Sequence, residues 1–171
     1  MLLRMAFLLL ALLPLPAAAQ SLEGSWALRV DGTTIFRFDL DQADGSWNGR
    51  WWLPRSFASD GNSFSRMRGP AEEVVANKGA ELGGWTELTF PDPRPGAVPD
   101  VFRFRPIGDE RAEMIYVGTD LAPYTLVRVA PDAPIGPWDA ERTYRRVTVE
   151  SLGLPPDPPP GGRPVDGVRE W

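Results

Sequence analysis

The chain contains neither histidine nor cysteine, which removes most of the side chains that carry enzyme chemistry. Histidine is the most common general base and metal ligand, and cysteine is the alternative nucleophile and zinc ligand. Ser-His-Asp, Cys-His and zinc-dependent mechanisms are therefore excluded. An enzyme with this sequence would depend on carboxylates, tyrosines or the single lysine: Glu72, Glu73, Glu87, Asp100, Tyr116, Tyr124 and Lys78.

None of these carboxylates forms a pair that the sequence marks as catalytic. Glycosidase chemistry needs two carboxyl groups held across a cleft, and no spacing here predicts such a pair. We therefore assign no catalytic residue and no cofactor. Asp39, Asp41 and Asp44 gather at one predicted hairpin tip and offer oxygen ligands of the kind that Ca²⁺ prefers. Gly45 comes one residue too late for a calcium loop, so we interpret the tip as a solvated turn and predict no metal site.

The first nineteen residues predict a secretory signal peptide. Arg4 precedes an apolar run at 5–13, and two prolines separate this run from the small residues 17–19. The prolines leave the run short of the roughly 20 apolar residues that span a bilayer. We expect cleavage after about Ala19 and a periplasmic or secreted protein without a membrane span; a retained anchor is the alternative.

Net charge limits the partners of the exported chain. The formal charge of the full sequence is −5 at pH 7, and it becomes −6 once the signal peptide is removed with Arg4, whereas binding to nucleic acid requires lysine and arginine to neutralise phosphates. We therefore expect no nucleic-acid partner. A small apolar ligand or an envelope protein remains as the possible partner.

Residues 22–130 predict an antiparallel β domain. Short runs of alternating apolar and polar residues are separated by turn residues about every ten positions. Phe36 and Phe38 fall on one face of such a run, and Ile35 and Arg37 on the other. The pattern predicts an all-β, up-and-down meander of eight or nine strands. Closure into a small barrel would remove the exposed edges, and a two-sheet sandwich is the alternative. The later strands are expected at 46–53, 64–68, 72–76, 82–90, 101–105, 114–117 and 124–129.

The remainder of the chain has a different composition. Residues 131–150 are predicted as a linker with a possible additional strand at 143–149. Residues 151–171 are rich in proline and lack core-forming side chains, so we expect a disordered tail.

The sequence from Gly24 to Trp52 resembles the opening of secreted calycin-type barrels, the lipocalin and avidin groups. Gly24-Ser25-Trp26 is similar to their first-strand Gly-x-Trp, and a hairpin leads to a second glycine- and tryptophan-containing strand. The resemblance implies that Trp26 lies at the base of a barrel and is covered by an arginine from a late strand, for which Arg128 is the candidate. Gly24, Trp26 and Arg128 are accordingly expected to have structural roles.

Aromatic side chains dominate the positions that are expected to face inward. They form either a packed core or the wall of a cavity for a small apolar or planar ligand. The proline-rich loop at 91–99 is long for a hairpin connection, and we expect it at the mouth of such a cavity. The candidate ligand-binding residues are Trp26, Phe36, Phe38, Trp47, Trp51, Phe102, Phe104, Tyr116 and Tyr124.

Three residues on the outer face are candidates for binding a partner protein. Trp52 follows Trp51 directly, so the pleat turns its indole away from the core. Arg103 and Arg105 alternate with inward-facing phenylalanines. A solvated face, or a covering by another part of the chain, would explain the same pattern.

These observations support three functional hypotheses. The preferred one is an exported, non-catalytic binding module that holds a small apolar or planar ligand. The alternatives are an envelope interaction or inhibitor factor, and a carboxylate-based isomerase or cyclase of barrel type.

Overall fold

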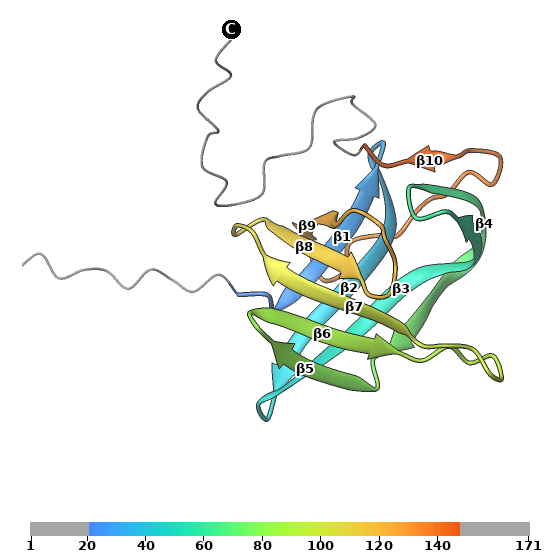
Figure 1. The fold of residues 1–171 in the computed structure, drawn as a ribbon. Coiled ribbons are helices and arrows are strands. Elements are labelled where there is room, and N and C mark those ends of the chain that lie inside the picture. The colour runs from blue at the N-terminus through green and yellow to red at the C-terminus, as the bar shows by residue number, and fades with distance from the viewer. Residues whose placement is uncertain (1–20, 148–171) are drawn as a thin grey trace, which may run out of the picture.

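The computed structural model describes residues 21–147, which form one sheet of ten antiparallel strands (Figure 1). The all-β antiparallel prediction is confirmed. The expected signal peptide (1–19) and proline-rich tail (151–171) lie outside the described residues. The strands are β1 (Gly24–Val30), β2 (Thr33–Ala43), β3 (Ser46–Ser59), β4 (Ser63–Val75), β5 (Lys78–Leu82), β6 (Trp85–Phe90), β7 (Asp100–Pro106), β8 (Arg111–Tyr116), β9 (Tyr124–Val129) and β10 (Tyr144–Arg145).

Strand order follows the predicted meander with one interruption. Consecutive strands pair from β1 to β4 and from β5 to β9, and β9 pairs with β1. β10 pairs with the outer side of β4. Within residues 21–147 no ladder joins β4 to β5, so closure into a barrel stays a prediction. The sheet nevertheless curls until β3 approaches β5 and β6.

The approach of β5 to β3 depends on Gly79. A Cβ atom at this position would stand 2.0 Å from the carbonyl oxygen of Trp47, far inside any real contact distance. The adjoining turn is fixed by a hydrogen bond that the Ala76 amide donates to the Gly49 carbonyl over 2.8 Å. The chain between β4 and β5 is therefore bound to β3, which brings the two ends of the meander together.

The boundaries of three predicted strands are wrong. The pattern predicts one strand over 82–90, whereas Gly83 and Gly84 have φ angles of 57° and 83° and form the turn between β5 and β6. Glycine adopts this left-handed region without a steric penalty, which permits a two-residue hairpin. Conversely, the predicted strands at 64–68 and 72–76 are parts of the single long β4, whose register with β3 is irregular.

The outer face of β2 is buried, because residues 131–147 pack over it. The Trp138 indole donates a hydrogen bond to the Thr34 carbonyl over 3.1 Å, and Tyr144 in β10 is fully covered. Ile35 and Arg37, which the alternation places outside, are consequently buried as well. The segment predicted as a linker is thus a covering layer up to residue 147, and its additional strand is only two residues long.

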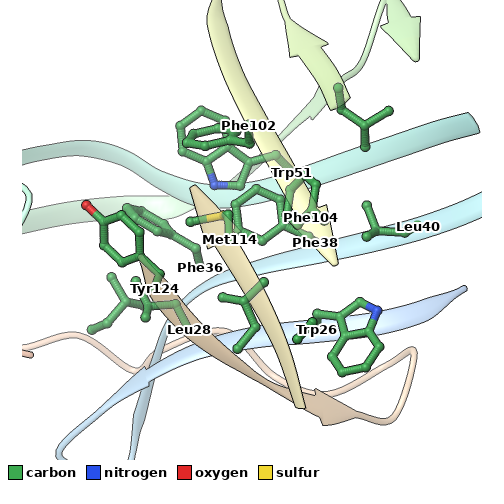
Figure 2. Packing of buried hydrophobic residues seen from close by; sticks show 14 of the residues in the cluster. Trp26, Leu28, Phe36, Phe38, Leu40, Trp51, Phe102, Phe104, Met114 and Tyr124 are labelled. Atoms are coloured by element: carbon green, nitrogen blue, oxygen red, sulfur yellow. The ribbon is translucent and has the colours of Figure 1, made fainter. Parts of the chain in front are cut away.

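Phe38 lies at the centre of the core (Figure 2). Its ring stacks on Trp51 with centroids 5.9 Å apart and meets Phe90, Phe102 and Phe104 edge-on at 5.2–6.2 Å. Such aromatic pairs contribute about 0.5–1.5 kcal/mol each beyond burial of area. Strands from both ends of the meander therefore converge on one ring.

Substitution of Gly79 tests the contact between β5 and β3. Gly79→Ala is expected to lower the free energy of unfolding by about 1–3 kcal/mol, because backbone must move to admit the methyl group. Urea unfolding followed by tryptophan fluorescence measures the change. Lys78→Ala, an exposed position on the same strand, is the control and should change stability by less than about 0.5 kcal/mol. Equal stability of both variants and the parent would contradict the assigned role of Gly79.

Candidate functional site

A cavity of about 610 Å³ lies among β2, β3, β4, β7, β8 and β9. This volume falls within the range of about 300–1,000 Å³ that is typical of small-molecule sites. In Figure 2, Phe36 and Tyr124 lie on one side of Met114, and Phe102 and Trp51 on the other. Six of the nine predicted ligand-binding residues line the cavity: Phe36, Phe38, Trp51, Phe102, Tyr116 and Tyr124.

The other three predicted ligand-binding residues lie elsewhere. Trp26 and Phe104 are fully buried in the core. Trp47 is half-buried, and its indole donates a hydrogen bond to the Glu81 carboxylate over 2.9 Å. Trp47 and Phe104 border a separate, smaller pocket of about 270 Å³. The alternation of apolar and polar residues correctly predicted that these three side chains point inward. It does not show where along the core each of them lies.

Trp26 is sealed by Arg128. The guanidinium carbon lies 4.2 Å from the indole centroid, and the three guanidinium nitrogens donate hydrogen bonds of 2.7–2.8 Å to the carbonyls of Ser21, Glu23 and Asp109. A Cβ atom on Gly24 would stand 2.6 Å from Nη1 of this arginine. Gly24, Trp26 and Arg128 therefore form one cluster that joins β1, β9 and the segment preceding β1.

Several cavity residues were missed by the sequence reasoning. Phe57 and Phe64 meet Phe36 at centroid distances of 5.3 Å each. Phe57 shares the parity of Trp51 and Leu53, so the alternation would have found it had the strand been extended past Pro54. Leu53, Phe57, Phe64, Val74, Met114 and Leu121 complete the apolar part of the wall.

The indole N–H of Trp51 is buried and makes no hydrogen bond with any of the described residues. In Figure 2 this nitrogen lies on the side of the ring that faces Met114. A buried donor without a partner is costly, typically by about 1–3 kcal/mol, and such groups are rare in folded proteins. The aromatic wall therefore contains a polar atom that the adjoining protein leaves unsatisfied.

A hydrogen-bonded pair, Asp100 and Tyr116, lies on the polar side of the cavity. The Tyr116 hydroxyl donates to the Asp100 carboxylate. Burial, reinforced by this hydrogen bond and by the negative charge of Asp100, raises the pKa of Tyr116 well above its ordinary value. Tyr116 is consequently protonated at neutral pH and acts as a hydrogen-bond donor.

The proline-rich loop reaches the cavity as predicted, through residues 91–94. Asp92 and Arg94 form an ion pair with an N–O distance of 2.5 Å. Hydrogen bonds from the Arg94 side chain and amide lower the pKa of Asp92 from 3.8 to about 2. Pro91 and Pro93 restrict the backbone on either side of Asp92. The loop therefore presents a charged but internally neutralised surface to the cavity.

Arg146 fixes the rim on the side of Tyr124. Its guanidinium carbon lies 4.0 Å from the Tyr124 centroid, and its side chain donates hydrogen bonds to Asn62 Oδ1 and the Pro123 carbonyl at 2.9 and 3.0 Å. Tyr124 in turn donates to the Gly61 carbonyl over 2.9 Å. Burial lowers the pKa of Arg146 and raises that of Tyr124. The last described residues thus connect two loops beside the cavity.

The three predicted partner-binding residues face outward, but each is engaged within the chain. Trp52 donates a hydrogen bond to Asp39 over 2.7 Å. Arg103 pairs with Glu87 at 2.8 Å, and Arg105 pairs with Glu113 at 2.5 Å. Arg105 also lies over the Trp85 ring, 4.4 Å from its centroid. These contacts fix the three side chains on the outer face, and their binding to a partner protein stays a prediction.

Asp39 is used in the same outer-face network. Its carboxylate accepts hydrogen bonds from Ser25 at 2.6 Å and Trp52, and it pairs with Arg37 at 3.1 Å. Across residues 21–147 no group of three or more acidic side chains is arranged to hold a metal ion. The same residues contain no helix of the length and apolarity needed to cross a bilayer.

Comparison of this chain with protein-family models, with curated proteins and with solved structures gives no match. The likeness to calycin barrels therefore rests on the residues from Gly24 to Trp52. The functional argument rests on the geometry of the cavity.

Replacement of Arg128 tests the cluster around Trp26. Arg128→Met is expected to lower the free energy of unfolding by roughly 1–3 kcal/mol, because it removes three hydrogen bonds and a cation–π contact. Chemical unfolding followed by circular dichroism measures the loss. Arg29→Met is the control, since Arg29 is an arginine with one exposed hydrogen bond, to the Gly32 carbonyl. A loss no larger than that of the control would contradict the sealing role.

Titration of Asp92 tests the geometry of the loop. With Arg94 present, the carboxyl carbon resonance of Asp92 should titrate with a pKa of about 2. Because the folded-state pKa is lowered, the ion pair stabilises the loop above pH 3.8 and is lost as the pH falls through about 2. In Arg94→Gln the pKa should rise toward 3.8. An unchanged pKa would show that Arg94 does not hold the carboxylate in solution.

Proposed function

We propose that this protein is an exported binding module that holds a small apolar or planar ligand in the cavity lined by Phe36, Trp51, Phe102, Tyr116 and Tyr124. The observation that carries the proposal is the size and aromatic lining of this cavity. The curled sheet would then act as a calycin-like barrel, with the signal peptide directing it to the periplasm or the medium.

The rigidity of the cavity wall supports the interpretation as a ligand-binding site over that of an incompletely packed core. Trp51 meets Phe36 at 5.5 Å and Phe102 at 5.2 Å, both nearly perpendicular, and Phe102 meets Tyr116 at 4.9 Å. Each ring is therefore held by a neighbouring ring, so the wall is organised before a ligand arrives. Preorganisation lowers the entropy that binding must offset.

Composition of the wall supports a binding role over catalysis. Eight aromatic side chains line the cavity, and its polar groups are a few carboxylates, guanidiniums and hydroxyls. Pockets for small molecules combine such apolar walls with a few polar groups that orient the ligand. The tyrosines are neutral donors, and we assign the lining no nucleophile and no general base.

A cavity-filling substitution tests the proposed function. Val74 lines the cavity, whereas its neighbour Val75 is exposed on the opposite face of β4. Val74→Trp is expected to weaken binding of a neutral phenylnaphthylamine dye by about tenfold or more, because the added indole occupies the space for the dye. Dye fluorescence enhancement measures the affinity.

Val75→Trp is the matched control, since it adds the same indole to the adjacent residue outside the cavity. It should bind the dye as the parent does. Circular dichroism establishes that both variants are folded. If the parent chain gives no fluorescence enhancement, or if the two variants bind equally, the cavity is not the binding site and the proposal is withdrawn.

A further inference from the structure

The cavity is lined by more acidic than basic side chains. Three carboxylates and two guanidiniums line it. Arg55 is bound to Glu72 at 2.5 Å, and Arg94 is bound to Asp92. Asp100 is the remaining carboxylate, and within the described residues no arginine or lysine pairs with it. The lining therefore carries one negative charge that is not neutralised by a contact within the protein.

Local structure directs this carboxylate to the aromatic wall. Asp100 is the first residue of β7 and precedes Phe102 by two positions, so both side chains project from the same face. Phe102 lies opposite Tyr116 of β8, whose hydroxyl donates to Asp100. This hydrogen bond holds the carboxylate beside Tyr116, whose ring is tilted by 40° to that of Phe102.

The carboxylate of Asp100 and the aromatic rings next to it both favour a cation. The faces of aromatic rings carry negative electrostatic potential and attract ammonium groups, as in the aromatic cages that bind quaternary ammonium ligands. Phe102 lies between Trp51 and Tyr116 with centroid distances of 5.2 and 4.9 Å, so three ring systems follow one another from the residue that donates to Asp100 into the cavity. A ligand carboxylate would find no unpaired guanidinium among the described lining residues and would lie beside Asp100 at a cost.

We propose that the ligand is a hydrophobic cation: an ammonium group that pairs with Asp100 at the Phe102–Tyr116 corner, attached to an apolar or aromatic body that fills the cavity. This inference rests on the proposed function, because it names the chemical class that the binding site takes. Arg94 lies within electrostatic reach of Asp100, but its guanidinium is already bound to Asp92.

Three naphthalene-based probes test the inference on the full chain, and the first two have nearly the same shape. They are naphthylmethyl-trimethylammonium, its neutral carbon isostere neopentylnaphthalene, and the anion naphthoate. Affinities are measured by quenching of tryptophan fluorescence at low and high salt. The ammonium is expected to bind about tenfold more tightly than the neutral isostere, and this advantage should shrink as salt screens the charge. Naphthoate should bind more weakly than either.

Asp100→Asn removes the charge and keeps an oxygen that accepts the Tyr116 hydrogen bond. It should weaken ammonium binding by about tenfold and leave the neutral isostere unchanged. Asp44→Asn is the matched control: it makes the same charge change at an exposed turn with φ of 52°, which asparagine tolerates. This variant should bind all three probes as the parent does.

The outcomes separate the two proposals. If the ammonium and its neutral isostere bind equally, or naphthoate binds as tightly as the ammonium, the cationic class is wrong and the apolar binding function stands. If none of the three probes binds, the proposed function fails as well. Should Asp100→Asn fail to fold, the ranking of the three probes on the parent chain decides the question.

Discussion

Burial of aromatic rings on the concave face of one curled sheet is the constraint on which the structure depends. Phe38 receives contacts from rings on β3, β6 and β7, so the strands at both ends of the meander share one centre. The cavity adjoins these rings, because Phe38, Trp51 and Phe102 also line it. The same residues therefore stabilise the fold and shape the cavity. For this reason the core residues and the residues that line the cavity overlap.

Alternation along the strands made much of this arrangement predictable. It placed Phe36 and Phe38 inside, separated Trp51 from Trp52, and put Arg103 on the outer surface, because a pleated strand turns successive side chains to opposite faces. The proline-rich loop was predicted at the cavity from its length alone. The resemblance supplied Arg128 as the cover of Trp26, a contact that alternation would not have suggested.

Other features depend on distances that a sequence pattern does not contain. Whether aromatic residues fill a core or surround a cavity depends on how far apart opposing strands lie, so Trp26 and Phe104 could not be told from Phe102. Trp138 and Tyr144 lie in a segment without periodicity: Trp138 is held against β2 by its hydrogen bond to Thr34, and Tyr144 is buried where β10 pairs with β4. The pairing of Arg94 with Asp92, which leaves Asp100 as the remaining acid, likewise requires coordinates. Gly83 and Gly84 indicate a turn, but the apolar residues around them led to the prediction of one continuous strand over 82–90.

The hydrogen bonds of Arg146 to Asn62 and Pro123 have a consequence for what holds the rim of the cavity in place. Arg146 reaches Asn62, 84 positions earlier, and Pro123, 23 positions earlier, and all three groups stand beside the rim. Every strand that contributes to the wall ends by Val129, so Arg146 holds the rim from a segment that follows these strands in the sequence. The shape of the rim therefore depends on a segment that supplies no strand of the wall, so a change at Arg146 can alter the opening of the cavity without replacing a residue that lines it.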